Sequence, residues 1–201
     1  ISSFSIPSTV TEIGNHAFAQ NPALKTIVVP AGVKKLGLGI FSLCTSLTSA
    51  RLPDNVDKMG NTVFWGCSAL TQVKLPQNLT EIPTGTFREC KSLARVDIPA
   101  SVTKIGQGAF QGCGLTSIIF PAGLTEIESE AFESCNRLTA VSIPGSAECK
   151  FMSFRNCKGL KKVTIGERYK STPYELNGIF MGCSFVNPRM TTTPACVTYQ
   201  P

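Results

Sequence analysis

The chain has 201 residues, of which 42% are hydrophobic and only 16% are charged, and this composition excludes a disordered chain. The formal net charge is +6 at pH 7, but the 19 Lys and Arg residues are spread along the chain, which favours a solvated basic surface over a nucleic-acid interface. We therefore expect no nucleic-acid partner. Because no apolar run is long enough to span a bilayer, we also expect no membrane-spanning segment.

A unit of 22 or 23 residues repeats along the chain, and each copy begins with an apolar residue that is followed by proline. Residues 1–5 align with the end of a unit, so we expect that trimming or processing removed an earlier part of the protein. Because a single unit cannot bury its apolar face alone, the repeat predicts a stacked solenoid over residues 1–183. The copies begin at residues 6, 29, 52, 75, 98, 120 and 143, and a degraded copy spans residues 165–183.

Each unit contains a strand pattern and a turn pattern. In the segment LTQVKLP, Val73 and Leu75 alternate with Gln72 and Lys74, which is typical of a strand with one buried face. The proline that follows ends the strand, because it lacks an N–H. The segment Ala-Phe-x-x-Cys-x-x-Leu spaces its apolar residues by three, which suits a helical or 3-10 turn. We therefore expect an α/β repeat with short parallel strands and 3-10 or helical turns.

The cysteines follow the repeat. Seven of the nine lie three residues after the recurring phenylalanine, and Cys90 among them stands between Glu89 and Lys91, where a thiol could become reactive. The neighbouring copies carry unrelated residues around the same cysteine, so we interpret Cys90 as a packed thiol. Disulfides between stacked copies are not expected, because coils about 4.8 Å apart hold Cβ atoms farther apart than the roughly 3.8 Å that a disulfide needs. Cys149 and Cys196 lie outside this ladder and could either pair or remain reactive.

No set of residues predicts catalysis, a metal or a cofactor. The only histidine is His16, so a Ser-His-Asp or Cys-His arrangement would have to be built on it alone, and we interpret it as exposed and non-catalytic. No C-x-x-C motif is present. The segment GQGAFQG at residues 106–112 lacks the third glycine of a dinucleotide-binding loop. We therefore predict a protein that is not an enzyme and has no cofactor.

The outward strand positions carry the candidate binding residues. Stacking aligns them into a stripe with a cationic middle at Arg51, Lys74 and Arg95, and with Asp97 beside Arg95. This stripe predicts a concave binding face for an acidic or polar partner, and a merely solvated sheet face is the alternative. The only tryptophan, Trp65, either anchors an interface or packs against the neighbouring coil.

A second stripe has mixed charge, and we expect it to form surface ion pairs that each stabilise little. The second stripe comprises Lys35, Lys58, Glu81, Lys104 and Glu126.

Residues 184–201 leave the repeat, and because solenoid ends need a cover, we expect a C-terminal cap there, with a frayed tail as the alternative.

The frame I-P-x-x-V-x-x-I-G-x-x-A-F-x-x-C-x-x-L, clearest over residues 98–113, resembles the BspA-like leucine-rich repeat family. That resemblance implies a right-handed, curved leucine-rich-repeat solenoid with a parallel sheet along one side. Members of the family are surface and secreted proteins, which implies an extracellular or cell-envelope location. The asparagine ladder of commoner leucine-rich repeats is missing, so we do not expect its hydrogen-bond spine.

The function that this resemblance implies is adhesion or protein binding without catalysis. We expect a non-enzymatic module whose partner is a protein, such as a host matrix or cell-surface protein, or a glycan. The alternative is a structural solenoid that homo-oligomerises through its ends or faces.

Overall fold

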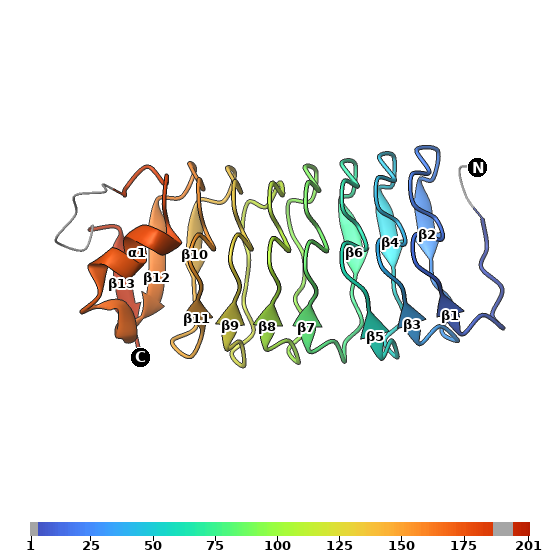
Figure 1. The fold of residues 1–201 in the computed structure, drawn as a ribbon, viewed down its shortest axis with the longest axis horizontal. Helices are drawn as coiled ribbons and strands as arrows, with labels where there is room; N and C mark the ends of the chain where they lie inside the picture. Colours follow the sequence, from blue (N-terminus) through green and yellow to red (C-terminus); the bar gives the residue numbers. More distant parts are fainter. Residues whose placement is uncertain (1–3, 187–194) are drawn as a thin grey trace.

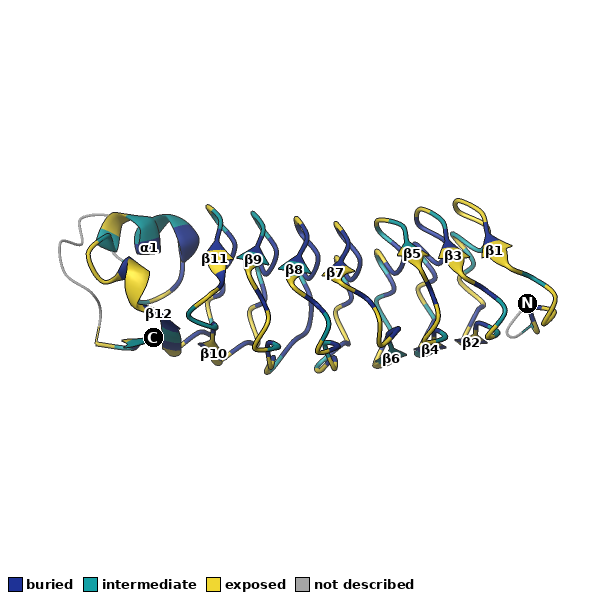
Figure 2. Ribbon diagram, turned by 90° about the horizontal axis from the view of Figure 1, so that it is seen from below, coloured by how far each residue is buried: buried dark blue, intermediate teal, exposed yellow. Residues whose placement is uncertain are grey.

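The structure, a computed structural model, describes residues 4–186 and 195–201. The chain winds into coils that stack side by side along one long axis, with the two termini at opposite ends (Figure 1). The stack is elongated and bends only slightly in the two ribbon views (Figures 1 and 2). The predicted repeat solenoid with short parallel strands is thus confirmed.

Most coils contribute a short strand to a first row of parallel strands. Registered pairing places Val28 beside Arg51 and Arg51 beside Lys74, so equivalent residues of successive units are neighbours. The strands have the alternating burial that the sequence predicts, because the middle residue points inward. The row comprises β2 (Thr26–Val28), β4 (Ser49–Arg51), β6 (Gln72–Lys74), β10 (Ala140–Ser142), β12 (Lys162–Gly166) and β13 (Val197–Gln200).

A second row of strands lies on another side of the coils, whereas the sequence analysis expected a sheet along one side only. Each of these strands has two residues, a charged residue outside and, in most of them, a buried apolar residue inside (Figure 2). Two residues are too few to show an alternating pattern in the sequence, so the signal was missed. The row comprises β1 (Glu12–Ile13), β3 (Lys35–Leu36), β5 (Lys58–Met59), β7 (Glu81–Ile82), β8 (Lys104–Ile105), β9 (Glu126–Ile127) and β11 (Glu148–Cys149).

The third side of each coil, the turn side, is a series of tight turns rather than a continuous 3-10 helix. Cys67 N donates to Phe64 O at 3.1 Å within the coil, whereas Phe64 N donates to Thr86 O of the next coil at 2.9 Å. In the same turn, Thr62 (φ 56°) and Gly66 (φ 72°) adopt left-handed backbone angles. A left-handed residue cannot continue a right-handed helix, so each turn ends after one hydrogen bond.

The helices of the structure lie near the C-terminal end of the stack. A 3-10 helix, η1 (Glu167–Tyr169), is followed by α1 (Pro173–Ile179) after the last regular coil, and β13 then adds a strand to the first row. The boundary at residue 183 between solenoid and cap stays a prediction, and residues 187–194 of the tail lie outside the described residues. No described helix combines the length and the apolar character that crossing a membrane requires.

Stacked phenylalanines form the core. The ring of Phe87 is fully buried, and its centroid lies 5.6 Å from that of Phe64 and 5.2 Å from that of Phe110. The same stacking continues from Phe18 to Phe180, because every coil presents the ring at the same height. Offset stacking at these distances is favourable, and each ring also removes a large apolar area from water.

The cysteine ladder is buried beside the phenylalanines and has a role that the sequence did not predict. Cys90 Sγ donates a hydrogen bond to Phe64 O at 3.1 Å, and Cys67 and Cys135 each bond the phenylalanine carbonyl of the preceding coil in the same way. All nine cysteines are free thiols, Cys149 and Cys196 included. The thiols therefore give each of these buried carbonyls a second donor beside the backbone N–H of its own turn.

Candidate binding surface

We call the outward side of the first strand row the strand face, from Thr26 in β2 to Thr164 in β12. Its outward residues form two columns, and Arg51 and Lys74 are neighbours in one of them. The 23-residue period places Asp97 next in that column, while Arg95 falls in the other column after Gln72. The predicted cationic middle is thus a pair of adjacent side chains with Arg95 set diagonally beside them.

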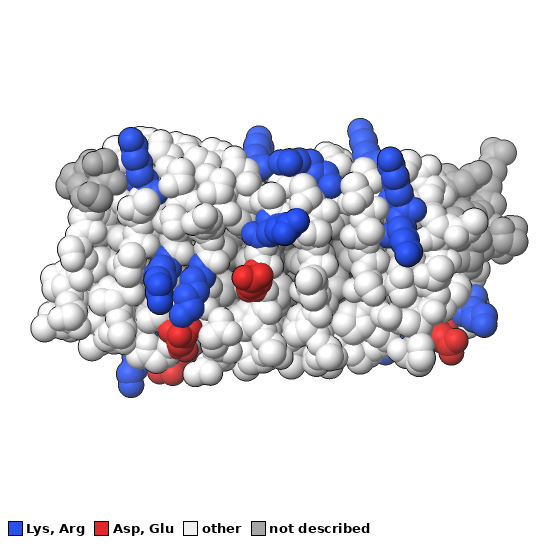
Figure 3. All heavy atoms as spheres, turned by 180° about the vertical axis from the view of Figure 1, so that it is seen from behind, with Lys and Arg blue, Asp and Glu red and all other residues white. Residues whose placement is uncertain are grey.

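The charges on the strand face are only partly neutralised. Lys74 Nζ lies 2.8 Å from Asp54 Oδ2, and this hydrogen bond holds the pKa of the Asp54 carboxyl below its ordinary value. Arg51 and Arg95 are exposed and form no ion pair with any described residue. Lys and Arg predominate among the charged side chains on this side of the molecule (Figure 3). The strand face therefore offers cations to a partner.

The strand row is interrupted between β6 and β10. Residues 95–97 and 117–119 form no strand, and here Ala94 O accepts hydrogen bonds from Thr116 N at 3.0 Å and from Thr116 Oγ1 at 3.2 Å. A crevice of about 480 Å³ lies between these segments, with the largely exposed Ile119 on its rim. The unit from residue 98 is one residue shorter than its neighbours, because Gly114 alone separates Cys113 from Leu115.

Trp65 does not lie on the strand face. It projects from the turn side of its coil, is 39% exposed, and borders a groove of about 320 Å³ that shares no lining residue with the crevice on the strand face. Its ring stacks on no other aromatic ring among residues 4–186 and 195–201. The structure therefore separates Trp65 from Arg51, Lys74, Arg95 and Asp97.

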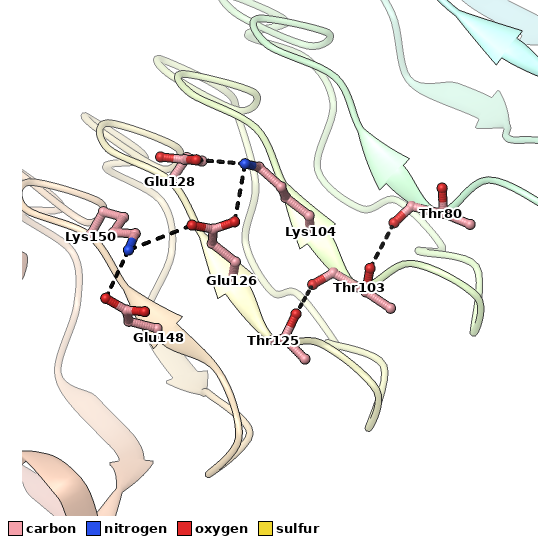
Figure 4. A network of polar contacts seen from close by, with 8 residues as sticks. All are labelled: Thr80, Thr103, Lys104, Thr125, Glu126, Glu128, Glu148 and Lys150. Carbon is pink, nitrogen blue, oxygen red and sulfur yellow. Dashed lines mark hydrogen bonds and ion pairs between the residues drawn. The ribbon is translucent and has the colours of Figure 1, made fainter.

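The second strand row carries a network of ion pairs (Figure 4). Lys104 Nζ lies 3.0 Å from Glu126 Oε2 and 2.7 Å from Glu128 Oε1, and Lys150 joins Glu126 to Glu148. These contacts raise the pKa of Lys104 and lower that of Glu126. The predicted ion pairs are confirmed for Lys104 with Glu126 and, at 3.8 Å, for Lys35 with Glu12.

The rest of the second stripe is less well paired than expected. Lys35 lies beside Lys58 in the register, and neither Lys58 nor Glu81 forms an ion pair with a described residue. Like charges on adjacent strands repel each other, so the neighbouring Lys35 and Lys58 do not stabilise the row by their charges.

A further crevice, of about 470 Å³, lies where the repeat becomes irregular, between β11 and α1. Exposed Phe151 and Tyr174 line it, and the sequence signal was the break in the repeat at residues 145–154. Its polar groups are already engaged, since Lys150 pairs with Glu148 and Tyr174 with Glu175. Among the described residues, no group of three His, Cys, Asp or Glu side chains could hold a metal ion.

The stacked parallel rows, the repeating apolar interior and the proline-terminated strands together define a leucine-rich-repeat solenoid. The chain belongs to the BspA-type leucine-rich repeat family: the family model described as "BspA type Leucine rich repeat region" matches residues 1–116 and 80–193, in six copies. None of the curated proteins matches the chain.

Solved structures of bacterial proteins share this fold. A leucine-rich repeat protein of Bacteroides ovatus ATCC 8483 is 34% identical over 83% of this chain, with a TM-score of 0.78, and the chain spans only 43% of its length. The leucine-rich repeat protein of T. pallidum is 27% identical, with a TM-score of 0.62, over 77% of this chain and 76% of its own. A leucine-rich cell-surface protein of Faecalibacterium prausnitzii A2-165 is 23% identical, with a TM-score of 0.51, over 87% of this chain and 62% of its own.

Proposed function

We propose that the protein is a non-enzymatic binding module that uses the strand face to bind an acidic surface of a partner protein. The observation that carries this proposal is the adjacent cationic pair of exposed Arg51 and half-buried Lys74, with exposed and unpaired Arg95 beside it. Leucine-rich repeat proteins are in general scaffolds for protein interactions, which supports the class of function.

The geometry of the strand face suits recognition of a folded partner. Backbone pairing between β4 and β6 holds the Cα atoms of Arg51 and Lys74 in fixed register, so little backbone entropy is lost on binding. Unpaired surface cations accelerate encounter with an anionic partner and suppress cationic partners, and salt screens both effects.

We place this activity outside the cell or at the cell envelope, with host matrix and cell-surface proteins as candidate partners. One solved structure of this fold is described as a cell-surface protein, and the family includes other bacterial proteins. An extracellular location would also bring the strand face into contact with matrix and surface proteins.

The test is binding of the purified chain to a panel of purified host matrix and cell-surface proteins, with Arg51, Lys74 and Arg95 all changed to Glu. We expect at least a tenfold loss of affinity for the proteins that the unmodified chain binds, and weaker binding at high salt. The control changes Lys34, Lys58 and Lys158 to Glu, which alters the net charge equally on exposed positions away from the strand face. Equal losses in the two triple variants would show that only net charge matters and would overturn the assignment of the site.

Self-assembly is the second candidate function. A crevice of about 310 Å³ at the first coil is lined by half-buried Phe4, Val10 and Phe18, and apolar surface of this kind can pack against another copy. Light scattering over a concentration series measures the molecular mass and so distinguishes a monomer from an assembly. A mass that rises with concentration supports assembly, and a monomer at the highest concentration excludes it.

A further inference from the structure

We propose that the groove beside Trp65, here called the Trp65 groove, binds pyranose rings of an oligosaccharide. The groove lies on the turn side of the stack and shares no residue with the strand face. The proposal extends the binding function to a second ligand class, and its site can be tested separately. The groove is lined by Thr62, Trp65, Thr84, Gly85, Arg88, Gln107, Gly108, Gln111 and Glu130.

The floor of the groove is open because glycine replaces larger residues in two successive coils. Gly85 and Gly108 occupy the turn position that holds Thr62 in the preceding coil and Glu130 in the following one. All four residues have left-handed backbone angles, with φ between 56° and 63°. Since Thr62 and Glu130 adopt this conformation with a side chain, the backbone angle alone does not require glycine. The effect of the two glycines is to leave a hollow between neighbouring coils.

The walls of the groove run along the stack. Trp65, Arg88 and Gln111 occupy equivalent positions in three successive units and form one side, and Thr84 and Gln107 stand on the other. Neighbouring coils are about 4.8 Å apart, so the wall from Trp65 to Gln111 covers about 10 Å. A volume of about 320 Å³ lies at the lower end of the range for small-molecule sites. The hollow therefore suits a short stretch of a flat, elongated ligand.

The polar groups around the groove are free to bind. The Trp65 indole N–H, the Arg88 guanidinium, the Gln107 amide and the Glu130 carboxylate make no side-chain hydrogen bond or ion pair with a described residue. Gln111 is the exception, because its amide donates to Glu133. The second strand row differs, since its Lys and Glu side chains neutralise one another. Both donors and acceptors thus face the Trp65 groove without internal partners.

This combination matches a sugar better than a peptide. A pyranose ring presents an apolar C–H face, which packs on an indole, and a rim of hydroxyls, which both donate and accept hydrogen bonds. An apolar peptide anchor would need an aliphatic pocket, and no aliphatic side chain lines this groove. Arg88 can meet either a hydroxyl or a carboxylate of the sugar, so neutral and acidic saccharides share the same recognition chemistry.

The experiment uses the built-in fluorophore, because Trp65 is the only tryptophan of the chain. The probes are cellohexaose, maltohexaose, chitohexaose and an oligogalacturonate, titrated into the purified chain while tryptophan emission is recorded. We expect a saturable change in emission with at least one probe, and calorimetry confirms the affinity. A response to the oligogalacturonate alone assigns an acidic sugar to Arg88, whereas a response to a neutral hexasaccharide assigns a neutral sugar. The absence of a saturable response to all four probes overturns the proposal.

Two variants test the site itself. Gly108→Asn fills the floor with a residue that tolerates left-handed angles, and a Cβ there would lie 3.5 Å from Gln111 Oε1 without a clash. Both Gly108→Asn and Arg88→Ala should weaken saccharide binding at least tenfold. The matched control is His16→Asn, which introduces the same residue at the equivalent left-handed position of the first coil, outside the groove. Full affinity in Gly108→Asn, or an equal loss in His16→Asn, overturns the site.

The Trp65 groove and the strand face can be distinguished in one further measurement. The variant with Arg51, Lys74 and Arg95 changed to Glu should bind the saccharide as well as the unmodified chain does. A saccharide affinity that falls with the strand-face charges would overturn the assignment to a separate groove, whatever the protein-binding test shows.

Discussion

The interior and the exterior of each coil follow opposite rules. In the interior, Phe64, Phe87 and Phe110 repeat without change, because each ring packs on the same ring of the next coil. On the exterior, the register that pairs Arg51 with Lys74 leaves both positions free to vary, because neither side chain has to pack against an identical residue of the next coil. Identity between coils therefore reflects packing, and differences between coils mark positions that packing does not constrain. The following predictions test this contrast, from the largest expected effect to the smallest.

The buried thiols as a set should make the fold sensitive to alkaline pH. Burial raises the pKa of Cys135 and of Cys149 to about 12, whereas an unfolded thiol has a pKa near 8.5. A raised folded pKa contributes stability that is complete below about pH 8.5 and is lost as the pH rises toward 12. Each such thiol should lower the free energy of unfolding by about 2 kcal/mol at pH 10.

Denaturant unfolding at pH 8, 9 and 10 measures this loss. The variant Cys135→Ala, although less stable at pH 8, should lose less stability between pH 8 and pH 10 than the unmodified chain. A free energy of unfolding that stays constant over this range would contradict the prediction.

Removal of one ring from the core should have the largest effect of any single substitution. Phe87→Ala deletes a fully buried ring from the middle of the stack and should cost about 3–5 kcal/mol of stability. Denaturant unfolding at pH 7 measures the change. Phe151→Ala is the matched control, since that ring is 55% exposed, and it should change stability by less than about 1 kcal/mol. Similar losses in the two variants would contradict the contrast between interior and exterior.

Removal of one thiol should cost less than removal of a ring. Cys90→Ala leaves a small void and removes one of the two donors to Phe64 O, so the free energy of unfolding should fall by about 1–3 kcal/mol. Cys196→Ala, at a half-exposed position outside the ladder, should cost less than about 0.5 kcal/mol. If both substitutions were equally tolerated, the hydrogen bond from thiol to carbonyl would have no role in stability.

The surface ion-pair network should contribute least. Lys104→Met removes the contacts with Glu126 and Glu128 and should cost less than about 1 kcal/mol at pH 7, because the three side chains are about one-third exposed. The raised pKa of Lys104 confines its contribution to pH values below about 10, and the lowered pKa of Glu126 confines the pairing to values above about 4.

Thermal unfolding of Lys104→Met and of the unmodified chain at pH 7 and pH 3 measures the network. The difference between the two should shrink from pH 7 to pH 3, because the pairing is lost as the pH falls through the lowered pKa of Glu126. Lys58→Met, in the same strand row but without an ion pair among the described residues, should show no pH-dependent difference. A difference that is unchanged at pH 3 would assign the role of Lys104 to packing instead.

Much of the fold could be predicted because the repeat multiplies each weak signal. The alternation around Val73 predicts one short strand, and its recurrence in every unit predicts the first row, although the strands expected at residues 95–97 and 117–119 do not form. Cys90 could be interpreted as a packed thiol for the same reason, since neighbouring units hold cysteine at that position. The second strand row escaped prediction, because a two-residue strand such as Lys104–Ile105 has no periodicity to detect.

The candidate sites were only partly predictable. The sequence left open whether Trp65 anchors an interface or packs against a coil, and the groove beside it depends on Gly85 and Gly108 lying in adjacent coils. Likewise the sequence grouped Arg51, Lys74 and Arg95, whereas the register separates them into two columns.

By itself the sequence determined the period, the inward residues and therefore the stacked solenoid, because a short repeated unit buries its apolar face only by stacking on its neighbours. Only the tertiary structure decided which charges are neutralised, which carbonyls the thiols satisfy and where the surface is hollow. These properties depend on contacts between residues about 23 positions apart, whose distances follow from the register of the coils and not from the order of the chain.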